Sequence, residues 1–76
     1  MTRYVLHPGH VISGDGDRHW VSAADLARLY RVPWRQCVVV DPNDRRTTAG
    51  FRDRPGDVHL YPSSGKGYDT LQEKSQ

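Results

Sequence analysis

Hydrophobic residues follow two different spacings between positions 21 and 40. Leu26, Leu29 and Tyr30 lie at positions i, i+3 and i+4, which share one face of an α-helix. Four apolar residues then follow one another over residues 37–40, as in a strand that is buried on both faces. This stretch therefore predicts a helix and, after it, the central strand of a sheet.

Both ends of the predicted helix carry a sequence signal. The Ser22 hydroxyl can accept a hydrogen bond from a free backbone N–H group of the first turn. The Asp25 carboxylate favours the positive end of the helix dipole. Pro33 disfavours helical geometry in the residue before it. We therefore expect the helix at about residues 23–32, a length that needs packing against a sheet to be stable.

The residues before this helix predict a β-hairpin. Residues 3–13 are rich in β-formers, but an internal Pro-Gly pair interrupts them. They form either one strand with a kink or bulge, or two short strands. Asp15-Gly16 is typical of a tight hairpin turn, and residues 18–21 then return as the second strand.

The remaining chain completes a small sheet. Residues 43–56 are polar and predict a long loop, in which Phe51 is expected to pack against the core. Apolar and polar residues alternate over 57–61, which indicates a half-buried strand. The predicted fold class is α+β: a small single domain in which the helix packs on a mainly antiparallel sheet, with strands near residues 36–41 and 57–61.

Length and composition bound the size of the core. A chain of 76 residues with 36% hydrophobic residues forms one domain, and its stability is expected to be small. We expect this domain over residues 1–68. Residues 69–76 are polar apart from one leucine, so we expect them to form a flexible C-terminal tail.

Several classes of protein do not fit the sequence. A single cysteine excludes an intrachain disulfide framework. No apolar run approaches the roughly 20 residues of a transmembrane helix, and no signal peptide is visible, so we expect a soluble, cytoplasmic protein without a membrane partner. The net charge of +2 does not by itself imply nucleic-acid binding.

Positive charge is concentrated in one part of the chain. Residues 28–54 contain seven arginines and three aspartates, a net charge of +4. Guanidinium groups can bind phosphate through paired hydrogen bonds, and flat rings can stack on a base. The predicted ligand or nucleic-acid site comprises Arg45, Arg46, Arg52, Arg54, Trp34, His59 and Tyr61. The alternative is a solvated loop whose charge keeps the protein soluble.

Four histidines are candidates for a metal site. Imidazole is a common ligand of zinc, and three of these side chains would converge if the strands that carry them are neighbours. The four are His7, His10, His19 and His59. Their spacing matches no standard zinc motif, so the alternative is ordinary hydrogen bonding on the face of a sheet.

The sequence contains no catalytic constellation, so we expect a protein that is not an enzyme and uses no cofactor. Residues 15–17 lack the later ligands of a calcium loop, and the Gly-Lys pair at 65–66 lacks the earlier glycine of a phosphate-binding loop. Ser22 is explained as a helix cap and has no nucleophile-elbow pattern around it. A strand follows the predicted helix where a helix-turn-helix motif requires its recognition helix.

Two segments carry a distinctive combination of residues. The first contains Tyr4-x-Leu6-His7-Pro8-Gly9-x-Val11, Asp15-Gly16, His19, Val21-Ser22-Ala23, Leu26-Ala27, Leu29-Tyr30 and Val32. The second is Gly56-Asp57-Val58-His59-Leu60-Tyr61-Pro62. Together they cover most of residues 3–62 and resemble small uncharacterised proteins of tailed bacteriophages and prophages. The resemblance implies a bacterial host cell as the setting, and it implies no activity and no catalytic residue.

Three hypotheses of function follow from these observations. The first is a small phage-type accessory protein, a non-enzymatic module that binds a host macromolecule or a nucleotide-like ligand. The second is nucleic-acid binding through the arginine-rich loop 45–54, and the third is a histidine metal site. The expected partner is a host protein or a nucleic acid, and the sequence does not distinguish between oligomeric states.

Overall fold

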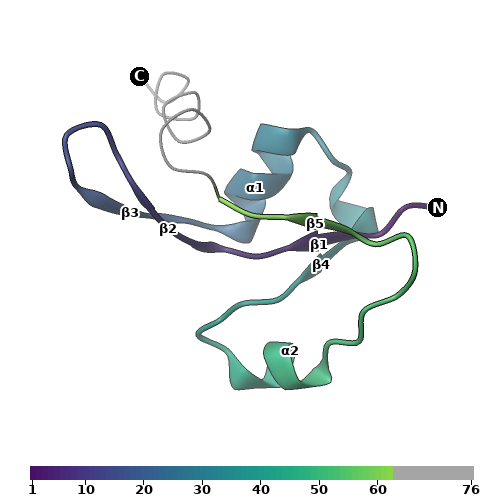
Figure 1. The fold of residues 1–76 in the computed structure, drawn as a ribbon. Coiled ribbons are helices and arrows are strands. Elements are labelled where there is room, and N and C mark those ends of the chain that lie inside the picture. The colour runs from purple at the N-terminus through teal and green to yellow at the C-terminus, as the bar shows by residue number, and fades with distance from the viewer. Residues whose placement is uncertain (63–76) are drawn as a thin grey trace.

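The computed structural model describes residues 1–62, which form two helices, a parallel sheet and an antiparallel hairpin (Figure 1). This set of helices and strands confirms the predicted α+β class. In chain order the elements are β1 (Tyr4–Leu6), β2 (Gly9–Ile12), β3 (Arg18–Val21), α1 (Ala23–Tyr30), a single 3-10 turn η1 (Trp34–Gln36), β4 (Cys37–Val39), α2 (Arg45–Gly50) and β5 (Val58–Leu60).

β1, β4 and β5 form the three-stranded sheet, in the order β4-β1-β5. Both pairings are parallel, and Val5 of β1 lies between Val38 of β4 and His59 of β5. The prediction of a mainly antiparallel sheet is therefore wrong here. Each parallel neighbour is reached through a crossover that contains a helix, α1 before β4 and α2 before β5.

The central strand is β1, and not the apolar run at residues 37–40. Val5 and Leu6 are fully buried, whereas the residues of β4 are only partly buried at the edge of the sheet. The prediction of a central strand at 37–40 is wrong, because within residues 1–62 one edge of β4 has no neighbouring strand. A three-residue strand such as β1 is too short for its burial to be recognised from its apolar pattern.

β2 and β3 form the predicted hairpin, so residues 3–13 comprise two short strands, one in each sheet. Gly16, in the turn, has φ of 89°, a conformation that glycine adopts without strain. Val11 and Val21 are buried on the inner face, and the exposed Trp20 pairs with His10 on the outer face. The hairpin projects from the sheet beside α1 (Figure 1).

α1 begins and is capped as its sequence predicts. The Ser22 hydroxyl accepts a hydrogen bond of 3.2 Å from the backbone N–H of Asp25. The helix ends at Tyr30, two residues before the predicted end, because Arg31 has a left-handed conformation with φ of 56°. The backbone N–H of Arg31 closes the last turn by donating to the carbonyls of Ala27 and Arg28.

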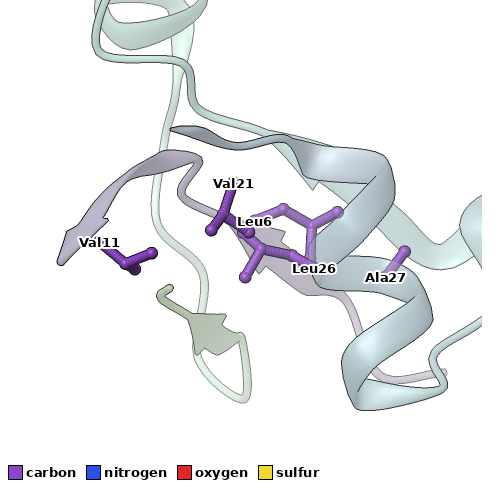
Figure 2. Close-up of a cluster of buried hydrophobic side chains, with 5 residues drawn as sticks. All are labelled: Leu6, Val11, Val21, Leu26 and Ala27. Atoms are coloured by element: carbon purple, nitrogen blue, oxygen red, sulfur yellow. The ribbon is translucent and has the colours of Figure 1, made fainter. Parts of the chain in front are cut away.

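The core lies between α1, β1 and the base of the hairpin (Figure 2). Its buried side chains are those of Leu6, Val11, Val21, Leu26 and Ala27. Five residues from four separate elements therefore form one apolar cluster, and it holds the hairpin and the helix on the same side of β1.

α2 occupies part of the segment that was predicted to be a loop. The Asp44 carboxylate caps it by accepting a hydrogen bond of 3.0 Å from the backbone N–H of Arg46. The hydroxyls of Thr47 and Thr48 bond to the carbonyl of Asp44. None of its six residues is buried, so hydrophobic periodicity could not reveal this helix. α1 and α2 lie on opposite sides of the parallel sheet (Figure 1).

Two further predictions concern the limits of the domain. The expected tail at residues 69–76, and the end of the expected domain at residues 63–68, lie outside the described residues. Within residues 1–62, neither helix has the length and apolar character needed to cross a membrane.

Candidate functional site

A pocket lies where the three parallel strands end. Because β1, β4 and β5 run in the same direction, the residues that follow them meet at one edge of the sheet. We call this hollow, of about 390 Å³, the carboxyl-edge pocket. Its lining residues are His7, Pro8, Gly9, Val40, Pro42, Thr48, Tyr61 and Pro62. In open parallel sheets, ligands bind at this edge.

The His7 side chain is held at this pocket from several sides. The backbone N–H of His7 donates to the carbonyl of Leu60 at 3.0 Å, which extends the pairing of β1 with β5. Its ring stacks on the Tyr61 ring, with centroids 4.2 Å apart and planes 7° apart. Its Nε2 atom lies 2.9 Å from Nδ1 of His59. His7 is therefore fixed by both backbone and ring contacts.

His59 links His7 to a carboxylate outside the pocket. The Nε2 atom of His59 lies 3.1 Å from an oxygen of Asp53, so the three side chains form the continuous chain Asp53–His59–His7. The edge of the Phe51 ring meets the His59 ring, with centroids 6.0 Å apart. The prediction that Phe51 packs against the core is wrong for the described residues, because its ring contacts are with His59 and Arg3.

The described side chains that line the pocket are uncharged near pH 7. Burial and the neighbouring His59 lower the pKa of His7 from its ordinary value of 6.5, so His7 is uncharged at neutral pH. Among the described residues, none of the others that line the pocket carries a carboxylate or a basic side chain. The pocket is therefore suited to a ligand group that is neutral and partly apolar.

Tyr61 provides an exposed flat surface. Its residue remains 57% exposed although one ring contact is made with His7. The Tyr30 hydroxyl donates to the carbonyl of Tyr61 at 3.0 Å, which ties this residue to the end of α1. The exposed aromatic ring is thus held in place and available for stacking.

The residues of the predicted arginine site are divided between two edges of the sheet. His59 is the middle residue of β5, and Tyr61 follows the strand at its carboxyl end. Trp34 precedes β4 and Arg54 precedes β5, so both lie toward the amino edge. Arg54 lines a separate polar pocket there, together with Arg3 and other residues of that edge.

The other three predicted arginines are exposed around α2. Arg45 and Arg46 lie in the first turn of α2, and Arg52 follows the helix. The Arg46 side chain is 96% exposed and lies 3.8 Å from the Asp44 carboxylate. No arginine lines the carboxyl-edge pocket.

The four histidines do not share one location. His7 and His59 are in contact, whereas His10 lies against Trp20 on the hairpin, with ring centroids 5.1 Å apart. His19 groups with two aspartates of the hairpin turn, and their candidate ligand atoms lie within 4.8 Å of one another. Within residues 1–62 this is the one group of three such ligands. The four-histidine metal site stays a prediction, with two of its members together.

Sequence reasoning missed several residues of the pocket. Pro8, Val40 and Thr48 come from three separate segments, and Asp53 reaches His59 from the loop before β5. Pro8 and Val40 lie inside segments that were predicted as strands, and Thr48 and Asp53 lie in the predicted loop, so no local pattern marked them. Their grouping follows only when the strands are known to be parallel, and the sequence predicted a mainly antiparallel sheet.

Comparisons with protein-family models, with curated proteins and with solved structures found no match. We therefore infer the function from the residues of this chain alone. Chemically, the carboxyl-edge pocket offers a fixed aromatic ring, apolar prolines and a valine, and a few polar groups. That combination is typical of a binding site for a small ligand.

Proposed function

We propose that this protein is a small non-enzymatic binding module whose ligand is nucleotide-like and places a flat ring in the carboxyl-edge pocket. The observation that carries the proposal is the exposed Tyr61 ring, fixed on His7 at the carboxyl ends of three parallel strands. Small ligands bind preferentially at such an edge.

The size of the pocket favours a small group over a macromolecular surface. Ligand pockets usually enclose about 300–1,000 Å³, and this one, at about 390 Å³, lies near the lower limit. A nucleobase or a ring of similar size is a suitable occupant. A ring of this kind would contact Tyr61 and leave any sugar or phosphate outside the pocket.

The resemblance to phage and prophage proteins supports a role inside a bacterial host cell, where we expect the protein to act in the cytoplasm. The ligand would then be a nucleotide-like molecule of the host or of the phage. Nucleic-acid binding through the arginine loop is less well supported, because Arg54 lines the pocket at the amino edge whereas Tyr61 lines the carboxyl-edge pocket.

Nuclear magnetic resonance of the full chain tests the proposal. Uridine or adenosine, added to ¹⁵N-labelled protein, should shift the amide signals of His7, Thr48 and Tyr61 together. Loss of the Tyr61 ring in Tyr61→Ala should weaken binding by the value of one stacking contact, about 1–3 kcal/mol.

The matched control is Trp20→Ala, which removes another exposed aromatic ring, located on the hairpin. Its binding should equal that of the natural chain. Shifts confined to the arginines, with an affinity that falls steeply as salt is added, would instead support the nucleic-acid alternative. Absence of shifts at the pocket with either nucleoside would contradict the proposed function.

A further inference from the structure

The Asp53–His59–His7 chain determines which ring nitrogen carries a proton. An ionised carboxylate only accepts hydrogen bonds, so Asp53 requires a proton on Nε2 of His59, 3.1 Å away. A neutral imidazole has one N–H group, so Nδ1 of His59 is then an acceptor. That acceptor lies 2.9 Å from Nε2 of His7 and requires the His7 proton to be there.

His7 is thereby left with one basic nitrogen. With its proton on Nε2, neutral His7 has a lone pair on Nδ1. Within residues 1–62 no hydrogen bond to this atom is found. Because His7 lines the carboxyl-edge pocket and Nε2 is turned to His59, Nδ1 is the nitrogen that remains for a ligand.

Thr48, the next polar side chain of the pocket, is also available to a ligand only as a hydrogen-bond acceptor. The Thr48 hydroxyl lies 3.1 Å from the carbonyl of Asp41 and 3.2 Å from the carbonyl of Asp44, so its proton is directed to the backbone. Only its lone pairs can meet a ligand. Apart from the Tyr61 hydroxyl, which can donate or accept, the polar side chains that line the pocket within residues 1–62 therefore offer acceptors.

We propose that the carboxyl-edge pocket selects neutral heteroaromatic rings that carry an N–H donor, with that donor bound by Nδ1 of His7 and the ring in contact with Tyr61. Asp53 and His59 are positioning residues, since they act on the ligand only through the tautomer of His7. The inference rests on the proposed function, because it names the class of ligand for the same pocket. Nucleobases with an imide N–H or an amino group belong to this class.

The order of donors and acceptors along Asp53–His59–His7 determines which ligands the pocket selects. If the proton of His7 were on Nδ1, the same pocket would offer a donor and would favour rings with an acceptor in that position. The carboxylate of Asp53 decides between the two cases, although it lies outside the pocket and its side chain is 67% exposed.

The tautomers can be measured directly on the full chain without a ligand. Two-bond ¹H–¹⁵N spectra of the imidazole rings, recorded at about pH 8, above the ordinary histidine pKa, should show His7 and His59 with the proton on Nε2. Asp53→Asn supplies an amide that can donate as well as accept, and should give a mixture of tautomers in both rings. Asp17→Asn, an exposed change on the hairpin turn, should leave both rings unchanged. A His7 proton on Nδ1 in the natural chain would overturn the inference.

A matched pair of ligands tests the selectivity. Uridine has an imide N–H, and 3-methyluridine has a methyl group in its place. We expect the methylated ligand to bind the full chain about threefold to tenfold more weakly, the effect of one lost hydrogen bond. In Asp53→Asn this ratio should fall toward one, while Asp17→Asn keeps it. Equal binding of the two ligands at the pocket would overturn the inference and leave the proposed function standing, whereas failure of both to bind there would overturn both.

Discussion

At the amino ends of β1 and β5, Arg3 and Asp57 form a two-point ion pair with distances of 2.9 and 2.5 Å. At the carboxyl ends of the same strands, the neutral rings of His7 and Tyr61 stack beside an apolar pocket. The two edges are separated only by the three residues of each strand, yet one is built from charges and the other from neutral groups.

The charges of the amino edge are largely satisfied by the fold itself. Asp57, whose side chain is 4% exposed, also accepts from the backbone N–H of Arg54 at 2.9 Å. Arg3 also donates to the carbonyl of Arg52 at 2.8 Å, and its guanidinium lies over the Phe51 ring, 5.5 Å from the centroid. These contacts fasten the loop before β5 to the start of β1 and occupy both carboxylate oxygens of Asp57.

At the carboxyl edge, by contrast, aromatic and hydrogen-bonding groups remain available to a ligand. Its aromatic surface is exposed and one histidine nitrogen has no partner within the described residues. The difference shows that a concentration of charge in a small domain can serve the fold. Neutral groups with unused stacking and hydrogen-bonding capacity are then the better guide to a binding site.

A smaller side chain at Leu6 should have the largest effect on stability, because both edges of the sheet depend on the same core. Leu6 is fully buried in the central strand, so Leu6→Ala should lower the free energy of unfolding by about 2–5 kcal/mol. That is a large share of the about 5–15 kcal/mol typical of a small protein. Urea unfolding followed by circular dichroism measures it. Ile12→Ala, at an exposed position of the hairpin, should cost less, and equal losses would contradict the assigned core.

Loss of the Arg3–Asp57 ion pair at the amino edge should lower the stability of the fold without weakening uridine binding. Asp57→Asn should lower the melting temperature more than Asp53→Asn, because Asp57 is buried against Arg3 whereas Asp53 is exposed. Uridine binding by the folded fraction should remain. If Asp57→Asn abolished binding without loss of stability, the assignment of the two edges would be wrong.

The Arg3–Asp57 ion pair should also make the stability of the protein depend on pH in the acidic range. The hydrogen bonds from Arg3, assisted by the backbone N–H of Arg54, hold the pKa of Asp57 well below its ordinary value of 3.8. The native state thus binds fewer protons than the unfolded chain below that value, and its stability is lost as the pH falls. Above a pH of 3.8, Asp57 makes its full contribution to stability. This acid-dependent component should be absent in Asp57→Asn, measured by urea midpoints over a pH series.

At the carboxyl edge the expected pH effect is smaller and lies in a different range. Because burial and His59 lower the pKa of His7 below 6.5, the unfolded chain binds more protons just below that pH. Stability should therefore fall as the pH is lowered through this window and level off above 6.5. His7→Gln should remove this component, and His10→Gln on the exposed hairpin should keep it. An unchanged slope in His7→Gln would contradict the assignment.

Local features were predictable from the sequence. The Ser22 cap, the hairpin turn at Asp15-Gly16 and the extent of α1 to within two residues each depend on neighbours a few positions apart. The αL conformation of Arg31 and the helix α2 were not predictable in this way. Arg31 is not a glycine, and α2 is held by the Asp44 cap and threonine hydroxyls without a buried face.

The candidate site was predictable only in part. His59 and Tyr61 were expected to contribute, but Trp34 and Arg54 lie toward the amino edge, away from the pocket. Asp53 and Thr48 were not expected at all. Their roles depend on which strands pair and in which direction, and no pattern within a single strand contains that information.

The sequence by itself determined the α+β class, the capped helix and the hairpin, because each follows from contacts between residues that are close in the chain. Only the tertiary structure decided that β1 is central, that its neighbours are parallel, and that His7 meets His59 and Tyr61 across more than 50 positions. Those contacts depend on helical crossovers that bring distant segments to one edge. The chemistry of the carboxyl-edge pocket is a consequence of that pairing.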